Sequence, residues 1–390
     1  MKPHYDIVVV GAGPAGATAA EYAARAGAAV LLLEKDREVG VPVRCAEGVG
    51  EKAFRDFFSE VPSSWISQRI TDAVLHAPSG AVVEVSSKST GLILDRKKFD
   101  FDLAHRAVQA GAELYTKANV RMVKIDKKRG AEVQVDWQGR PHALSAALVI
   151  GADGVESRVG RWAGLKTSLP VAEIDACCQV LAGPLDLPMH VCHFYFSRQW
   201  APGGYAWVFP KGDNLANIGL GVSGDHCQNQ RPYDLLQQFL RHHFPQARQL
   251  GFVSGGVPCA KPMKKIVSDR LLLVGDAAHQ ANPLTGGGIM NALLAGRLAG
   301  TIAGQALQEG QTTAERLSEY ERLWQQGEGA KLAMSFRLKK FVFSLEDSAF
   351  DRLAETTLKL PFEKRTIINI FRQALLKQPS LIWEAVRLFT

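Results

Sequence analysis

A glycine-rich loop near the N-terminus places the strongest constraint on how this chain can fold. Residues 5–10 form a continuous apolar run with β-branched side chains, which predicts a buried parallel strand. Three glycines follow in the spacing GxGxxG, at Gly11, Gly13 and Gly16. Residues 15–26 then predict a helix, and residues 29–33 predict a second apolar strand. This order predicts a parallel α/β unit that binds a dinucleotide.

Each position in this loop has a physical role. Gly11 permits a tight turn, Gly13 lets a pyrophosphate approach the backbone, and Gly16 lets the helix pack closely on the strand. The start of the helix offers free N–H groups and a positive dipole end to the phosphates. Glu34 ends the second strand, where its carboxylate can accept hydrogen bonds from ribose hydroxyls and would repel a 2′-phosphate. The predicted cofactor is therefore FAD or NAD rather than NADP.

Two later segments also contain a buried strand that runs into glycine and aspartate. Residues 148–158 read LVIGADGVESR, and residues 270–288 read RLLLVGDAAHQANPLTGGG. Asp276 can hold ribityl or ribose hydroxyls at the end of its strand. The bare backbone of the final glycines, just before a helix expected from Ile289, can stabilise negative charge on a reduced flavin.

These three segments, in this order, resemble those of the para-hydroxybenzoate hydroxylase-like flavoprotein superfamily. The resemblance implies an α/β fold: a discontinuous Rossmann-like FAD-binding domain, an inserted antiparallel-sheet substrate domain and a C-terminal helical region. The expected boundaries are 1–75, 95–165 and 265–310 for the FAD-binding domain, 76–94 and 166–264 for the substrate domain, and 311–390 for the helical region. The implied FAD contacts are Gly11, Gly13, Ala15, Gly16, Glu34, Lys35, Arg44, Cys45, Ala46, Arg96, Val120, Asp153, Gly154, Gly275, Asp276, Pro283, Gly286, Gly287, Gly288 and Ile289.

The middle of the chain predicts an antiparallel sheet with one face over the flavin. Alternating runs typical of strands occur at residues 193–196, 205–209 and 217–222. In the run GGYAWVFPKG, alternation places Tyr205, Trp207 and Phe209 on one side of a strand. Three aromatic side chains on one strand face also suit plain core packing, so alternation alone leaves their role open.

The motif YxWxFPKG, with Tyr205, Trp207, Phe209, Pro210 and Lys211, resembles that of geranylgeranyl reductases. These FAD-dependent enzymes saturate isoprenoid double bonds. The segment PVRCAEGVG at residues 42–50 also resembles this family, whose cysteine lies close to the flavin. The resemblance implies hydride transfer and protonation at isolated C=C bonds of a prenyl chain on a lipid, quinone or pigment precursor. The implied catalytic residues are Cys45, Tyr205 and Trp207, and the implied substrate pocket is Tyr205, Trp207 and Phe209.

Several roles at this site stay open. An isolated alkene is a poor hydride acceptor, so its reduction needs a dry pocket that holds a flexible chain in one pose. The proton could come from Tyr205 or from a water near the late glycines. Cys45 is either a flavin-facing or redox thiol, with Arg44 favouring its thiolate, or a small buried group. Arg96 contacts the ribityl-phosphate region, as the resemblance implies, or is a surface charge at a helix start.

Other function classes also remain open from the sequence. An FAD-dependent aromatic hydroxylase of the same superfamily would consume oxygen and NAD(P)H. A flavin-bound electron carrier or membrane-docked scaffold would turn over no alkene. The sequence indicates no separate NAD(P)H domain, so the donor to a reductase is either NAD(P)H or a protein such as reduced ferredoxin.

Charge and cysteine content narrow the partners and the compartment. Lys and Arg outnumber Asp and Glu by 46 to 39, which suits an anionic cofactor, substrate or lipid surface, and their scatter argues against nucleic acid. The six cysteines lack CxxC spacing, which predicts no metal site and favours the cytoplasm. Residues 314–325 and 330–343 predict helices. The second helix mixes basic and aromatic residues, so it either rests peripherally on an anionic membrane or closes the substrate pocket.

Overall fold

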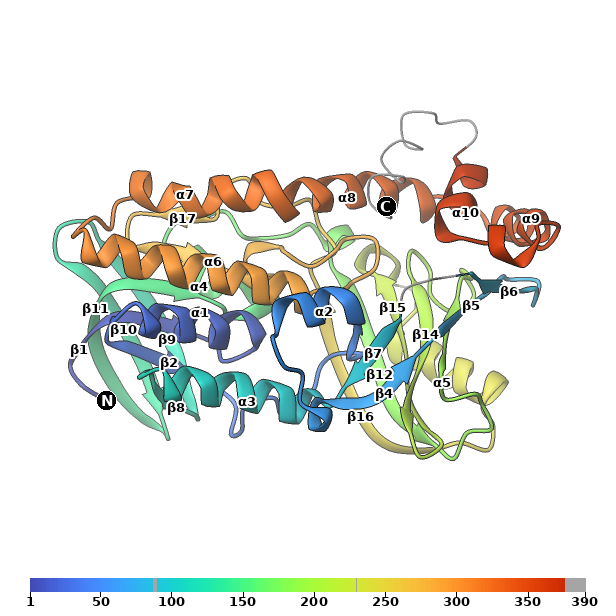
Figure 1. The fold of residues 1–390 in the computed structure, drawn as a ribbon, viewed down its shortest axis with the longest axis horizontal. Coiled ribbons are helices and arrows are strands. Elements are labelled where there is room, and N and C mark those ends of the chain that lie inside the picture. The colour runs from blue at the N-terminus through green and yellow to red at the C-terminus, as the bar shows by residue number, and fades with distance from the viewer. Residues whose placement is uncertain (87–89, 229, 376–390) are drawn as a thin grey trace.

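The computed structural model describes residues 1–86, 90–228 and 230–375, and two large sheets organise this part of the chain (Figure 1). The first sheet runs in the order β17-β18-β11-β1-β2-β8, and β10 and β9 extend it antiparallel from β11. β1 pairs in parallel with both β2 and β11. The strands are β1 (His4–Val10), β2 (Val30–Leu33), β8 (Glu113–Tyr115), β9 (Ala118–Asp126), β10 (Gly130–Trp137), β11 (Arg140–Gly151), β17 (Val267–Ser268) and β18 (Leu271–Leu273).

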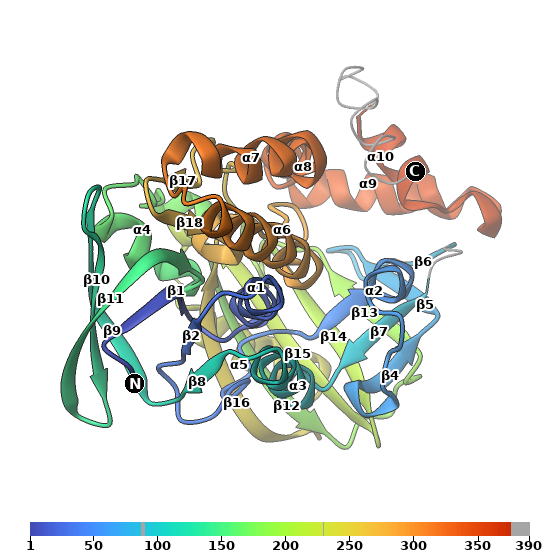
Figure 2. The ribbon, with the colours of Figure 1, turned by 60° about the vertical axis from the view of Figure 1, so that its left-hand side comes forward.

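Three helices lie side by side on one face of the parallel strands (Figure 2). They are α1 (Pro14–Arg25), α3 (Arg96–Gln109) and α6 (Ile289–Gln308). Gly296, Gly300 and Gly304 recur every four residues along α6, and a Cβ at any of them would collide with α1 or its C-terminal cap. Residues at this spacing share one helix face, so the three glycines let α6 and α1 approach to backbone contact.

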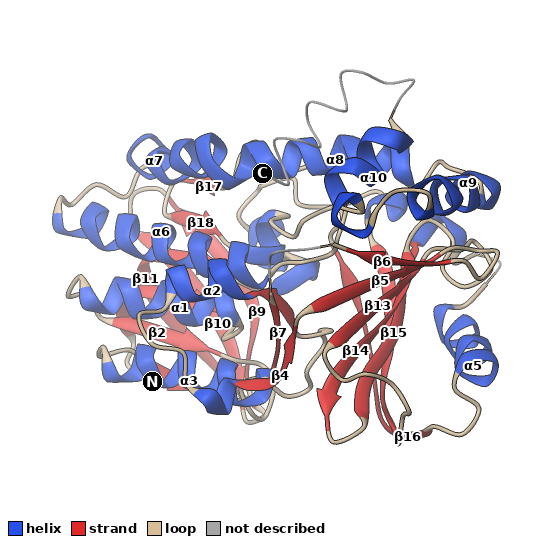
Figure 3. Ribbon diagram, turned by 45° about the vertical axis from the view of Figure 1, so that its right-hand side comes forward, coloured by secondary structure: helices blue, strands red, loops and turns tan. Residues whose placement is uncertain are grey.

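The second sheet runs in the order β16-β12-β15-β14-β13-β5-β6 and is antiparallel except between β13 and β5. α5 (Pro232–His243) covers one of its faces, where Val180, Ile218 and Phe239 share a buried cluster (Figure 3). Its strands are β5 (Asp72–His76), β6 (Val82–Val85), β12 (Asp175–Gly183), β13 (Val191–Tyr195), β14 (Tyr205–Gly212), β15 (Leu215–Ser223) and β16 (Arg248–Val257). A small sheet of β3 (Gly48–Gly50), β7 (Gly91–Leu94) and β4 (Ile66–Ile70) packs beside β14.

The C-terminal part is helical. Its helices are α7 (Ala314–Trp324), α8 (Ala330–Val342), α9 (Asp347–Leu358) and α10 (Ile367–Ala374). A π-helical turn, Gln325–Gly329, joins α7 to α8, so that the two form one long line above both sheets (Figure 1). Two shorter helices are α2 (Glu51–Phe57) and α4 (Arg158–Trp162).

The predicted α/β fold class is confirmed. The strand predicted at residues 5–10 is β1, the helix predicted at 15–26 is α1, and the helix expected from Ile289 is α6. The predicted domain boundary after residue 75 falls inside β5, which pairs within the second sheet. Residues 376–390 of the predicted helical region lie outside the described residues.

Candidate flavin and substrate site

The glycine loop after β1 has two glycines that the protein itself requires and one that it does not. Gly11 has a φ of +102°, and a Cβ there would collide with the carbonyl of Ala152. A Cβ at Gly16 would collide with the carbonyl oxygen of Gly11. A Cβ at Gly13 would meet nothing within 4 Å. Gly13 therefore borders open space at the uncapped start of α1, which fits a phosphate held by backbone N–H groups.

Glu34 lies at the end of β2, beside this loop. Its carboxylate accepts hydrogen bonds from the N–H groups of Ala12 at 2.8 Å and Asp36 at 2.9 Å. Each carboxylate oxygen keeps further lone pairs, so Glu34 can still accept a ribose hydroxyl. Lys35, the next residue, is exposed. The ribose contact of Glu34 and the FAD contact of Lys35 stay predictions.

The two later glycine and aspartate segments converge on the same edge of the first sheet. The N–H of Ala152 donates to Val10, and the N–H of Val274 donates to Gly151. Asp153 follows directly, and one of its carboxylate oxygens is buried without a hydrogen-bond partner among the described residues. Burial raises the pKa of Asp153. An orphaned acceptor here fits a hydroxyl-bearing cofactor.

Asp276 and the loop after it form the other wall of this edge. Burial raises the pKa of Asp276 to about 6, and the nearby positive charge of Arg96 opposes that rise. A Cβ at Gly288 would lie 3.5 Å from Oδ1 of Asp276, so the glycine end of the loop passes close to the carboxylate. The side-chain oxygen of Asn282 accepts the N–H groups of Leu284 and Thr285 and braces the loop. Pro283, Gly286, Gly287 and Ile289 all lie on this loop or at the start of α6.

Arg96 starts α3, and the interpretation of it as a surface charge is wrong. Its side chain is 13% exposed and its guanidinium makes two hydrogen bonds to Asp100, at 2.6 and 2.7 Å. Its backbone N–H donates to Glu47 at 3.0 Å. Val120 lies on β9, two residues after Ala118, whose N–H donates to Glu34. Whether Arg96 and Val120 contact FAD stays a prediction.

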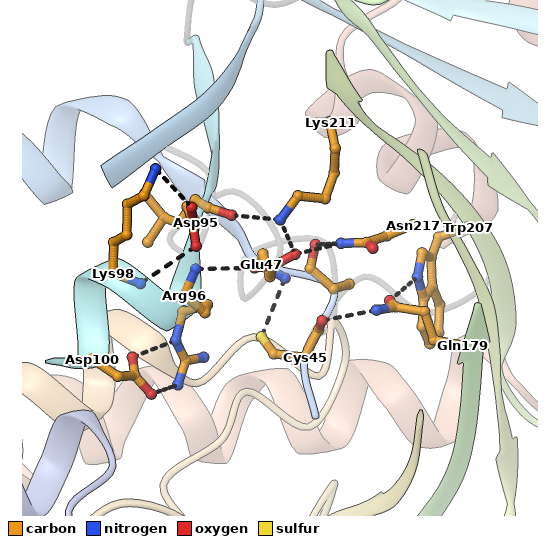
Figure 4. Close-up of polar contacts among 12 residues, drawn as sticks. Cys45, Glu47, Asp95, Arg96, Lys98, Asp100, Gln179, Trp207, Lys211 and Asn217 are labelled. Carbon is orange, nitrogen blue, oxygen red and sulfur yellow. Dashed lines mark hydrogen bonds and ion pairs between the residues drawn. The ribbon is translucent and has the colours of Figure 1, made fainter. Parts of the chain in front are cut away.

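A chain of hydrogen bonds joins Cys45 to the second sheet (Figure 4). The carbonyl of Cys45 accepts Nε2 of Gln179 at 3.0 Å, and Oε1 of Gln179 accepts the indole N–H of Trp207 at 3.0 Å. The Cys45 thiol sulfur accepts the N–H of Glu47 at 3.2 Å. These bonds hold the Cys45 backbone against the strand face that carries Trp207.

The structure does not support the expectation that Arg44 favours a Cys45 thiolate. Burial raises the pKa of the Cys45 thiol, and the positive charge that partly opposes this rise is that of Arg96. The Arg44 side chain is 49% exposed and pairs with Asp36 at 3.7 Å. Cys45 is therefore a protonated thiol near neutral pH.

Glu47, two residues after Cys45, also binds the segment around Cys45 to the second sheet (Figure 4). It is buried, with a φ of +72°. Its carboxylate accepts hydrogen bonds from Lys211 on β14 and from Asn217 on β15, the latter at 2.6 Å, as well as from the N–H of Arg96. Backbone in the left-handed region is costly for a residue other than glycine, and the three contacts stabilise it.

The predicted aromatic face is confirmed as a face. Ring centroids lie 5.9 Å apart between Tyr205 and Trp207 and 6.4 Å apart between Trp207 and Phe209, while Ala206 and Val208 point into the cluster under α5. Trp207 is buried and lies over the backbone of β15: a Cβ at Gly219, directly opposite, would be 2.5 Å from its ring.

Tyr205 connects this face to the glycine loop before α6. Its hydroxyl donates to the carbonyl of Thr285 at 2.6 Å, and burial raises its pKa well above the ordinary value, so the phenol stays protonated. Phe194 and Phe196 extend the aromatic face, with ring centroids 5.9 and 6.0 Å from that of Tyr205. The second sheet therefore contacts the glycine loop through Tyr205 and the Cys45 segment through Gln179.

Sequence reasoning missed Glu47, Gln179 and Asn217. Asn217 lies directly opposite Phe209 in the β14–β15 pair, and Gln179 lies opposite Gly219 in the β12–β15 pair, so both share the face of Trp207. For Gln179 and Asn217, the one signal in the sequence was the alternation of side chains along each strand, extended to the neighbouring strands of the sheet. Lys211 continues the alternation of Tyr205, Trp207 and Phe209 along β14. The resemblance of this motif included Lys211 but implied no role for it.

This glycine loop, with two acidic segments at the same sheet edge and a second sheet against them, defines an FAD-dependent oxidoreductase. The family model for an FAD dependent oxidoreductase matches residues 6–204, and the model for the geranylgeranyl reductase catalytic domain matches residues 173–257. Over its full length, the chain is 40% identical to digeranylgeranylglycerophospholipid reductase 1 of Methanococcoides burtonii and 39% identical to digeranylgeranylglycerophospholipid reductase of Methanocella arvoryzae. The alignments cover 96% and 100% of those proteins. The chain belongs to the geranylgeranyl reductase family.

Solved structures agree with this assignment. The crystal structure of a geranylgeranyl bacteriochlorophyll reductase-like protein from Thermoplasma acidophilum matches with a TM-score of 0.90 and 31% identity, over 99% of each chain. A flavin-dependent brominase matches over 98% of this chain with a TM-score of 0.74 but only 18% identity, which shows the fold alone. The comparisons favour the predicted reductase over the aromatic hydroxylase.

The structure places the basic and aromatic C-terminal helix whose role the sequence left open. The basic and aromatic helix predicted at 330–343 is α8, and it buries Phe336, Leu338 and Lys339. This packing fits a helix that closes over the site, and contact of α8 with a membrane stays a prediction. Within the described ranges, we find no helix with the length and apolar character needed to cross a bilayer.

Proposed function

We propose that this protein reduces the isolated double bonds of digeranylgeranylglycerophospholipid, the lipid in the names of its relatives. The observation that carries the proposal is the aromatic face of β14. It is bound to the Cys45 segment through Gln179 and to the glycine loop through Tyr205. Residues 1–75, 95–165 and 265–310 would hold FAD, residues 76–94 and 166–264 would hold the lipid chain, and residues 311–390 would cover both.

Different residues would bind FAD, hold the lipid chain and lie beside the reacting carbon atoms. FAD, when bound, supplies the hydride equivalent for reduction of the alkene. Gly13 would hold its phosphates, and Asp153 and Asp276 its hydroxyl groups. Trp207 and Phe209 would exclude water and fix the flexible chain, because each aromatic side chain has only two torsions to freeze. Cys45 would lie beside the reacting carbon atoms as a neutral thiol.

A proton must reach the second carbon of the alkene. Tyr205 is one source, although its hydroxyl already donates to Thr285 and its raised pKa makes it a weak acid. A water near the glycines at 286–288 is the other. The electron donor is either NAD(P)H or reduced ferredoxin. A cytoplasmic enzyme that contacts the membrane peripherally would meet such a lipid, and both points are part of the proposal.

The test is anaerobic turnover of the purified yellow protein with dithionite as the electron source. We expect mass spectrometry to show stepwise addition of two hydrogens for each double bond of digeranylgeranylglycerophospholipid. The matched control is the same lipid with fully saturated chains, which should leave the reduced flavin unchanged. Reduction of free prenyl diphosphates but not of the lipid would refute the substrate. Oxygen insertion with NAD(P)H would refute the reaction.

A further inference from the structure

Helix α8 is attached to both parts of the site at two adjacent residues. Leu338 is fully buried in a small cluster that includes Leu284 of the glycine loop. The ammonium group of Lys339 donates to Oδ1 of Asp175, the first residue of β12, at 2.8 Å and to the carbonyl of Cys259 at 3.1 Å. One turn of α8 therefore contacts the loop before α6, the second sheet and the segment after β16.

The ion pair between Lys339 and Asp175 is buried, with side-chain exposures of 8% and 13%. Removing two charges from water is costly, and a buried pair often stabilises a fold less than apolar residues of similar size would. A buried pair is best justified where it selects one arrangement of two surfaces. Here the two surfaces are α8 and the face of the second sheet that carries Trp207.

Asp175 lies on the same face as the aromatic side chains. It is two residues from Cys177 and four from Gln179 on β12, so alternation places all three on one side. The Cβ position of Gly221 lies 4.0 Å from Asp175, 3.9 Å from the Trp207 ring and 3.1 Å from the Cys177 sulfur. The ion pair therefore closes the edge of the face on which the substrate would lie.

The glycine loop is held from two sides next to this pair. Tyr205 binds the carbonyl of Thr285, and Leu284, the residue before it, packs against the buried cluster formed by Leu338 and Leu375. Movement of α8 would release the second contact and leave the first. The loop that precedes the start of α6 would then lose part of the cluster that holds it, while the bond to Tyr205 and the loop's own hydrogen bonds would remain.

We propose that Lys339 and Asp175 are a positioning pair for alkene reduction, which holds α8 closed over the substrate face and the glycine loop. Lys339 acts through Leu338 and Leu284 and touches no reacting atom. This inference rests on the proposed function for its kinetic test and is independent of it for its structural tests. Misplacement of reacting groups by about 1 Å costs on the order of 100-fold in rate, so loss of the pair should lower kcat more than it raises KM.

The test compares three variants. Lys339→Met leaves Asp175 buried and unpaired, and the double variant Asp175→Asn with Lys339→Met removes both charges and keeps the volumes. Lys340→Met is the matched control, because Lys340 is exposed on the same helix and its ammonium lies over the Phe336 ring. The measurements are thermal melting, hydrogen exchange of residues 283–288 and of α8 in the FAD-free protein, oxygen reoxidation of the reduced flavin without substrate, and steady-state kinetics.

We expect the double variant to melt within a few degrees of wild type. Its residues 283–288 should exchange faster, its reduced flavin should react several-fold faster with oxygen, and its kcat should fall roughly 10- to 100-fold with KM changed less than threefold. Lys340→Met should match wild type throughout. A double variant that melts normally and also exchanges, reoxidises and turns over like wild type would overturn the proposal. Failure of the wild type to reduce the lipid would count against the proposed function alone, since the exchange and oxygen measurements need no substrate.

Discussion

Two glycines in one loop should respond to the same substitution in opposite ways. Gly13 has a φ of −68° and open space at its Cβ position, so Gly13→Ala should change the stability of the FAD-free protein by less than about 1 kcal/mol. The added methyl group would occupy the approach of the phosphate and break one or two charge-assisted hydrogen bonds. Each such bond contributes about 1.5–3 kcal/mol, so the loss of one or two should cost about 1.5–6 kcal/mol and raise the Kd of FAD by at least roughly 10-fold.

Gly16→Ala should instead damage the fold. Its Cβ would lie well inside the 3.0 Å that real Cβ atoms essentially never cross, and the opposing atom is the backbone oxygen of Gly11. A backbone oxygen cannot rotate away, so α1 must shift from β1. Overpacking of a core costs about 1–3 kcal/mol where side chains can yield, and here we expect about 3 kcal/mol or more.

The assay separates the two effects. FAD is removed from each variant, the FAD-free protein is melted, and FAD is titrated back while its fluorescence is followed. The expected result is normal melting with weak binding for Gly13→Ala, and early melting for Gly16→Ala. A Gly13→Ala protein that melts normally and binds FAD as tightly as wild type would refute the placement of the phosphates at this loop.

Three further predictions address the site and the second sheet. Cys45→Ser should lower turnover strongly with FAD content and melting temperature near wild type, and an unchanged rate would make Cys45 a packing residue. Trp207→Phe removes the N–H that holds Gln179, so anaerobic reoxidation of the reduced flavin by the lipid should slow more than lipid binding weakens; Trp207→Ala should also cost about 3–5 kcal/mol of stability. Burial lowers the pKa of His76 to about 4, with a further contribution from His193, and its ring stacks on Tyr195. The unfolded chain therefore binds this proton first, so its contribution to stability is complete above about pH 6.5 and is lost as the pH falls towards 4. The melting temperature should fall less steeply over that range in His76→Phe, and parallel pH curves would contradict the assignment.

Much of the fold follows from patterns within short segments. The apolar run of β1, the loop at Gly11 to Gly16 and the start of α1 are set by neighbours within a few residues, because turn chemistry and helix capping act over that range. Alternation likewise put Tyr205, Trp207 and Phe209 on one strand face, and the structure confirms that face. Local periodicity determines which way a side chain points.

Other features depended on which side chains the tertiary structure buries. Arg96 pairs with Asp100 one turn along its own helix, but the 13% exposure of its side chain depends on how the rest of the fold packs around the start of α3. Arg44 was expected to activate Cys45, but its side chain points to Asp36, and burial of the thiol has the larger effect. The burial of a charged side chain cannot be read from its neighbours in sequence.

The sequence by itself determined the dinucleotide loop and the aromatic strand face from spacing within short segments, and the α/β class from the order of such segments along the chain. Only the tertiary structure decided which residues far apart in the sequence contact one another around those features. Glu47 meets Asn217 across 170 residues of chain, Gln179 meets Cys45 across 134, and Lys339 meets Asp175 across 164. Each of these contacts joins elements whose distance is set by the packing of whole sheets and helices, and no local pattern carries that information.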